Sequence, residues 1–180
     1  MPGRSAAQAR DEFLVPLRRA LSCITTAQLY VASRARTGAP EVLALSQDPL
    51  QLRSAKLGTV QLLLGHQFRL VAESRKDWHV STIAYGYHLL DGNSREIAAW
   101  HWHPGTGTEH PHLHVSGTSI DRRAHLPTGR VSIESIIRLL LTDMEVQPAR
   151  GHAADYLRIL EETERLFTQH RRWHSWRPGT

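Results

Sequence analysis

The sequence predicts an α+β fold, an antiparallel β-meander with helices packed on one face and helical N- and C-terminal regions. Apolar residues recur at helical spacing near both ends of the chain, and alternating apolar and polar residues fill the middle. Asp91-Gly92-Asn93, between two alternating segments, is typical of a hairpin turn. A chain of 180 residues is long enough for one core, so we expect a single domain over residues 1–180.

The N-terminal region, residues 1–65, is expected to be helical. From Asp11 to about Arg36, leucine and isoleucine recur at helical spacing. Asp48 followed by Pro49 fits an N-cap and the first helical residue. We therefore expect a second helix from Pro49 to Leu64.

The antiparallel sheet is expected within residues 66–117. Tyr85, Tyr87 and Leu89 alternate with other residues and would share the core face of one strand. The predicted strands are Gln67–Glu73, His79–Leu90, Arg95–His103 and Pro111–Ser116.

The C-terminal region, residues 131–172, is expected to hold two helices after an irregular segment from Gly117 to Gly129. Ser132 is a typical N-cap residue, and the isoleucines and leucines after it recur at core spacing. Asp155 would begin the final helix, which runs to about Arg171.

Composition narrows the function classes. Lys and Arg exceed Asp and Glu by 22 to 17, a net charge of +5, which suits an anionic partner such as RNA or a nucleotide, or simply a solvated basic surface. The single cysteine, Cys23, excludes an intrachain disulfide and a thiolate zinc cage. No apolar run approaches the roughly 20 residues of a spanning helix, so we expect a cytoplasmic protein with no membrane partner.

Histidines gather in one short segment, since five of the twelve lie between His101 and His114. Side chains alternate faces along a strand, so His101 and His103 share one face, with Trp100 and Trp102 on the other. His112 and His114 share a face of the next strand, and His110 has the same parity. A hairpin would bring the two pairs together, with opposed Cβ atoms roughly 5 Å apart.

Such a cluster supports two kinds of chemistry. Neutral imidazoles bind transition metals, so His101, His103, His112 and His114 are candidate ligands of a divalent ion such as zinc. Neighbouring imidazoles can also act as acid and base on a ribose 2′-hydroxyl and a leaving oxygen, which makes His110, His112 and His114 candidate catalytic residues. The alternatives are a purely structural metal site, or exposed sheet histidines with no common ligand.

Two basic segments are candidate contacts for an anionic substrate. Arg122, Arg123 and Arg130, with His125, follow the cluster and would bind phosphate, unless they are solvated loop charges. Near the end of the chain, cations alternate with aromatic residues, a composition suited to single-stranded RNA or to packing against the core. The nucleic-acid-binding candidates there are Arg171, Arg172, Trp173 and Trp176.

Three family resemblances involve the histidine segment. The segment from His110 to Val115 resembles the histidine-triad motif of nucleotide hydrolases, which implies a nucleophilic His112. The segment from His101 to Pro104, followed by Glu109, is similar to the first metal motif of cupins. The order of strands, histidine-rich loop and amphipathic helix from Val80 to Val146 resembles the TumE family of toxin–antitoxin proteins. That last resemblance implies a small bacterial RNA-cleaving toxin with an antitoxin partner, and His112 and His114 as its site residues.

Three functional hypotheses follow. The first is a histidine-dependent phosphodiesterase or ribonuclease of toxin type acting on RNA, a hydrolase. The second is a zinc-binding interaction protein without catalytic activity, and the third is a histidine-triad-like nucleotide hydrolase. The cofactor, the substrate and the oligomeric state stay open at the level of sequence.

Overall fold

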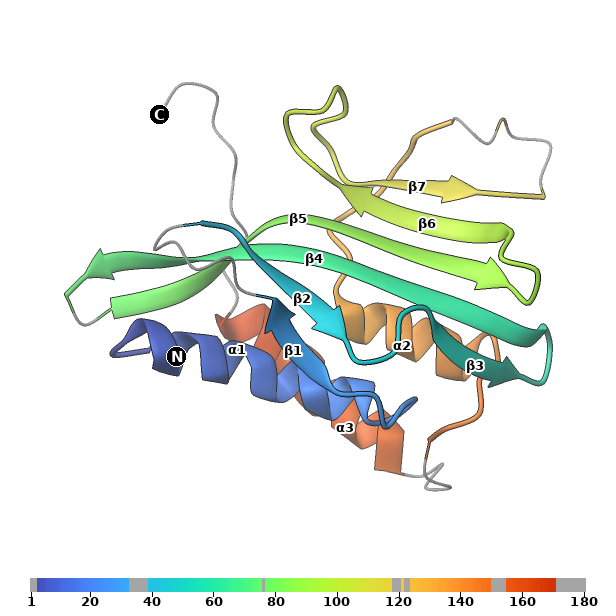
Figure 1. The fold of residues 1–180 in the computed structure, drawn as a ribbon, viewed down its shortest axis with the longest axis horizontal. Coiled ribbons are helices and arrows are strands. Elements are labelled where there is room, and N and C mark those ends of the chain that lie inside the picture. Colours follow the sequence, from blue (N-terminus) through green and yellow to red (C-terminus); the bar gives the residue numbers. More distant parts are fainter. Residues whose placement is uncertain are drawn as a thin grey trace.

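The protein is an α+β domain in which three helices cover one face of an eight-stranded antiparallel sheet (Figure 1). These counts refer to the described part of this computed structural model: residues 3–32, 39–75, 77–117, 121, 124–149 and 155–170, with side chains to residue 166. The predicted fold class, including helices near both ends of the chain, is confirmed.

The helices are α1 (Ala6–Leu21), α2 (Ile133–Thr142) and α3 (Asp155–His170). The strands are β1 (Leu29–Ala32), β2 (Glu41–Leu45), β3 (Leu50–Ser54), β4 (Gly58–Ser74), β5 (Asp77–Asp91), β6 (Glu96–Trp102), β7 (His112–Val115) and β8 (Leu126–Pro127). The strand order is β1-β2-β4-β5-β6-β7-β8, and β3 pairs with the first part of β4. All pairings are antiparallel between the described strands.

The prediction of a helical region over residues 1–65 is wrong beyond α1. The first helix begins at Ala6 and ends at Leu21, and the segment Leu29–Ala32 is a strand. The helix expected from Pro49 to Leu64 is instead β3, a turn and the start of β4. Every second residue of β3 is buried, and Val60, Leu62 and Leu64 of β4 are buried, so the apolar side chains follow the strand period. Pairing between β3 and β4 satisfies the backbone.

The central and C-terminal predictions are confirmed in outline. The turn at Asp91 joins β5 to β6, and the last two expected strands are β6 and β7. Ser132 caps α2, since its Oγ accepts a hydrogen bond from the backbone N–H of Ser135 at 3.0 Å. The segment from Gly117 to Gly129, expected to be irregular, contains the short strand β8.

The core lies between the helices and one face of the sheet. Tyr85, Tyr87, Trp100 and Trp102 are all buried on this face, as predicted. Tyr85 pairs with Trp102 and Tyr87 with Trp100, so these aromatic residues fix the register of β5 against β6. The opposite face of the same strands carries the histidines. Within the described segments, no helix is both long and apolar enough to cross a membrane.

Candidate metal centre

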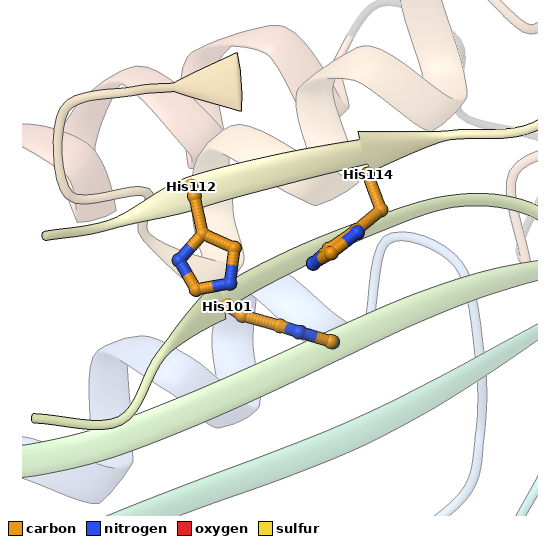
Figure 2. A group of neighbouring side chains, drawn as sticks. All are labelled: His101, His112 and His114. Carbon is orange, nitrogen blue, oxygen red and sulfur yellow. The ribbon is translucent and has the colours of Figure 1, made fainter. Parts of the chain in front are cut away.

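Three neighbouring strands place histidines on the sheet face that the helices leave uncovered. His101 of β6 pairs directly with His112 of β7, and Ala99 pairs with His114. Strand alternation then directs all three imidazoles to one side of the sheet. Figure 2 shows the rings of His101, His112 and His114 converging between β6 and β7. The structure therefore brings together the histidine pairs that the sequence places on one face.

The three rings are close enough to share one ion. Their centroids lie 5.6 Å apart for His101 and His112, and 5.1 Å apart for each of the other two pairs. One ring nitrogen from each residue lies within 4.8 Å of the corresponding atoms of the other two. Zinc–nitrogen bonds of about 2.0–2.1 Å place two ligands of one ion at most about 4 Å apart. Side-chain movements that shift each ring nitrogen by less than about 1 Å would bring the three nitrogens within bonding distance of one ion.

His112 has a buried, unprotonated ring nitrogen that is suited to bind a metal ion. Its side chain is 2% exposed, and Nδ1 lies 2.9 Å from the carbonyl oxygen of His110, to which it donates its proton. The neutral ring then has no proton on Nε2, and this buried nitrogen has no hydrogen-bond partner among the residues that the structure describes. Burial lowers the pKa of His112 and keeps the ring neutral.

His101 lies at the centre of the cluster. Burial, followed by repulsion from His88, His114, His112 and His103, lowers its pKa from 6.5 to about 4. A metal ligand must carry a free lone pair, and this ring is neutral at physiological pH. The electrostatics therefore favour metal binding over protonation.

Two further histidines flank the three. The ring centroid of His103, a predicted ligand, lies 5.6 Å from that of His101 and 5.4 Å from that of His112. Its Nδ1 is hydrogen-bonded to Oγ1 of Thr106. His125 stacks on His112 with a centroid distance of 4.4 Å, and its Nδ1 lies 2.7 Å from Oγ1 of Thr108. These rings extend the cluster toward solvent and each leaves Nε2 for another partner.

Other predicted site residues lie elsewhere. The side chain of His110 is exposed, and this residue contributes its backbone carbonyl to the site. The guanidinium carbon of Arg130 lies 3.9 Å from the ring centroid of Trp102, on the core side of β6, so it is not beside the imidazoles. Arg122, Arg123, Arg171, Arg172, Trp173 and Trp176 lie outside the described residues.

Sequence reasoning missed His88 and Glu96. His88 of β5 contacts His101 with a centroid distance of 4.7 Å, and strand alternation could have found it, because Tyr87 and Leu89 face the core. Glu96 lies 3.0 Å from Nδ1 of His88. Glu96 lies an even number of residues before the core-facing Trp100 on β6, so strict strand alternation would place its side chain on the core face and not on the histidine face. A register shift between Leu89 and Leu90 pairs Glu96 with Leu90 and turns the Glu96 side chain to the histidine face.

A pocket of about 270 Å³ opens beside the His101 ring. Gly65, Ala84 and Gly86 form part of its lining, with His88 and His101 next to them. Because Gly65 pairs with Gly86, the sheet face has no side chains at this point. A small ligand could therefore approach the imidazoles along the sheet surface.

Comparisons with family models, curated proteins and solved structures find no match for this chain. A function is therefore inferred from the chemistry of the site and from the sequence. Neutral imidazoles with bare nitrogens are ligands for zinc and other borderline transition metals. Three protein ligands, the number that His101, His112 and His114 supply, is the number typical of catalytic zinc sites.

Proposed function

We propose that the protein is a zinc-dependent ribonuclease that holds its metal through His101, His112 and His114 and cleaves phosphodiester bonds in RNA. The buried Nε2 of His112 carries this proposal, because within the described part of the chain it has no hydrogen-bond partner and lies near two further imidazoles. A buried polar atom without a partner costs about 1–3 kcal/mol, and a metal bond would remove that cost.

The surroundings favour a catalytic ion over a structural one. The three ligands lie on the opposite sheet face from the apolar core, which packs against the helices. Structural zinc sites have four protein ligands and are closed, whereas catalytic sites keep one position open. The pocket beside His101 gives a substrate access to that position.

RNA as substrate rests on the net charge of +5 and on the resemblance of the region from Val80 to Val146 to the TumE family. An antitoxin partner rests on that resemblance alone. The histidine-triad alternative gains no support, because a nucleophilic His112 must reach a phosphorus atom and its side chain is almost completely buried.

Bound zinc would supply Lewis acidity at a phosphoryl oxygen. The 2′-hydroxyl attacks the adjacent phosphorus, and the bond to the 5′-oxygen breaks to give a 2′,3′-cyclic phosphate. The outer rings, His103 and His125, would move the two protons, one from the 2′-hydroxyl and one to the leaving oxygen. Their Nδ1 atoms are held by Thr106 and Thr108, which orients each Nε2 for this role.

Metal-free acid–base catalysis is the second candidate. In this candidate the outer rings His103 and His125, held at Nδ1 by Thr106 and Thr108, would act as base and acid without an ion. Both candidates predict RNA cleavage with no cleavage of a 2′-deoxy substrate. Only the first predicts that a chelator abolishes it.

The test combines zinc titration with an RNA-cleavage assay on wild type, His112→Ala and the matched control His110→Ala. We expect one zinc ion per wild-type chain, at least a 100-fold weaker affinity in His112→Ala, and no change in His110→Ala, which keeps its carbonyl. Cleavage should follow zinc occupancy. A folded wild-type protein that binds no zinc would overturn the metal proposal. Zinc binding without turnover, with unfolding that loses cooperativity in chelator, would indicate the non-catalytic zinc protein instead.

A further inference from the structure

We propose that Glu96 and His88 are positioning residues that hold His101 in the tautomer whose Nδ1 is the metal ligand. This inference rests on the zinc site proposed above and goes beyond it, because it names the ligand atom and a hydrogen-bonded chain that selects it. Neither residue contacts the ion in this arrangement; both act through His101.

The chain consists of two hydrogen bonds along the uncovered sheet face. Oε2 of Glu96 lies 3.0 Å from Nδ1 of His88, and Nε2 of His88 lies 3.2 Å from Nε2 of His101. The register shift between β5 and β6 pairs Leu90 with Glu96, and this moves the carboxylate to the histidine side. All three side chains are partly buried, so water competes weakly for these bonds.

Proton counting fixes the tautomers. An ionised carboxylate only accepts, so Nδ1 of His88 carries the proton that it donates to Glu96. When each ring carries one proton, Nε2 of His88 is an acceptor and Nε2 of His101 donates to it. A neutral imidazole has one proton, so Nδ1 of His101 keeps its lone pair.

The two paired ligands therefore use different nitrogens. His112 donates through Nδ1 to the His110 carbonyl and coordinates through Nε2, while His101 donates through Nε2 and coordinates through Nδ1. In both residues, the nitrogen that does not bind metal is held by a hydrogen-bond acceptor. Such partners fix ring orientation and raise ligand basicity, and their loss typically weakens metal affinity 10–100-fold.

The experiment uses the full-length wild type, Glu96→Gln and a matched control, Glu73→Gln. Glu73 pairs with His79 at 3.8 Å at the other end of the β4–β5 hairpin, so the control removes a similar carboxylate away from the cluster. The amide of Glu96→Gln can flip and donate to His88, which removes the tautomer selection without a change of size. Zinc affinity is measured by competition with a chromophoric chelator, and ring-nitrogen NMR of the zinc-loaded wild type identifies the coordinating atoms.

We expect Nδ1 coordination by His101 and Nε2 coordination by His112 in the wild type. Glu96→Gln should bind zinc 10–100-fold more weakly, with the same metal-free unfolding midpoint as wild type, and Glu73→Gln should match wild type. If the wild type binds zinc but His101 coordinates through Nε2, or if Glu96→Gln binds as tightly as wild type, this inference fails and the zinc site stands. If the wild type binds no zinc, both fail. The NMR assignment needs no variant, so the proposal can be rejected even if Glu96→Gln does not fold.

Discussion

Acidification should destabilise the metal-free protein through the histidine cluster, in a pH range where most carboxylates stay ionised. The pKa of His101 falls from 6.5 to about 4 on folding, so the unfolded chain takes up a proton that the folded chain refuses. Stability is then complete above pH 6.5 and declines as pH falls toward 4, at about 1.4 kcal/mol per pH unit for one group. The lowered pKa of His112 acts in the same direction.

The magnitude follows from the width of that window. Between pH 6.5 and about pH 5, His101 alone would remove about 2 kcal/mol, and solvent screening of its partly exposed ring reduces this to about 1 kcal/mol. The assay is urea unfolding with chelator present at about pH 7.5, 6 and 5, with a His101→Gln variant as the neutral comparison. The wild type should lose about 1 kcal/mol more than His101→Gln over this range. Equal losses in the two proteins would refute the assignment of a depressed pKa to His101.

Three further predictions, which use five substitutions, test the site and the packing of the helices. Gly86→Ala should keep zinc affinity, because its Cβ would lie 3.6 Å from the His101 and His88 rings, an ordinary van der Waals contact. The larger, branched side chain of Gly86→Val should displace His101 and weaken zinc binding at least tenfold in the same titration. Leu140→Ala should cost about 2–5 kcal/mol in urea unfolding because the side chain is fully buried, while exposed Leu157→Ala should change stability by under about 0.5 kcal/mol. Ser132→Ala should cost about 1 kcal/mol by removing the N-cap of α2, and an unchanged midpoint would contradict that role.

Local periodicity was sufficient for part of the fold and misleading for the rest. The helix α2 and the β5–β6 hairpin follow from spacing that fits one period only. The segment 50–64 fits two periods. Leu50, Leu57 and Leu64 suggest a helix, whereas Leu50, Leu52 and Leu62 with their neighbours alternate as strands. Pairing between β3, β4 and β5 decides between these readings, and that contact is not local in sequence.

Part of the candidate site could likewise be predicted from local sequence, and part of it depends on tertiary structure. Parity alone predicted that His101 and His112 would share a face, because both lie on regular strands joined by a short connection. Glu96 depends on a bulge, and the stacking of His125 on His112 depends on the chain folding back after β7. Arg130 is close to the cluster in sequence, but it stacks on Trp102 at the other face of β6. Proximity along the chain carries no information about which face of a sheet a returning segment will reach.

Stability alone does not account for the cluster. Neighbouring imidazoles on β5, β6 and β7 lie 4.7–5.6 Å apart between ring centroids, so each protonation is resisted by the others. Threonine or valine at these positions would suit an uncovered sheet face better. Local costs of this kind typically mark functional sites, where the favourable term appears only when the ligand binds. An ion accepted by three neutral rings converts a buried, unpartnered nitrogen into a coordinate bond, and this is the term that the metal-free protein lacks.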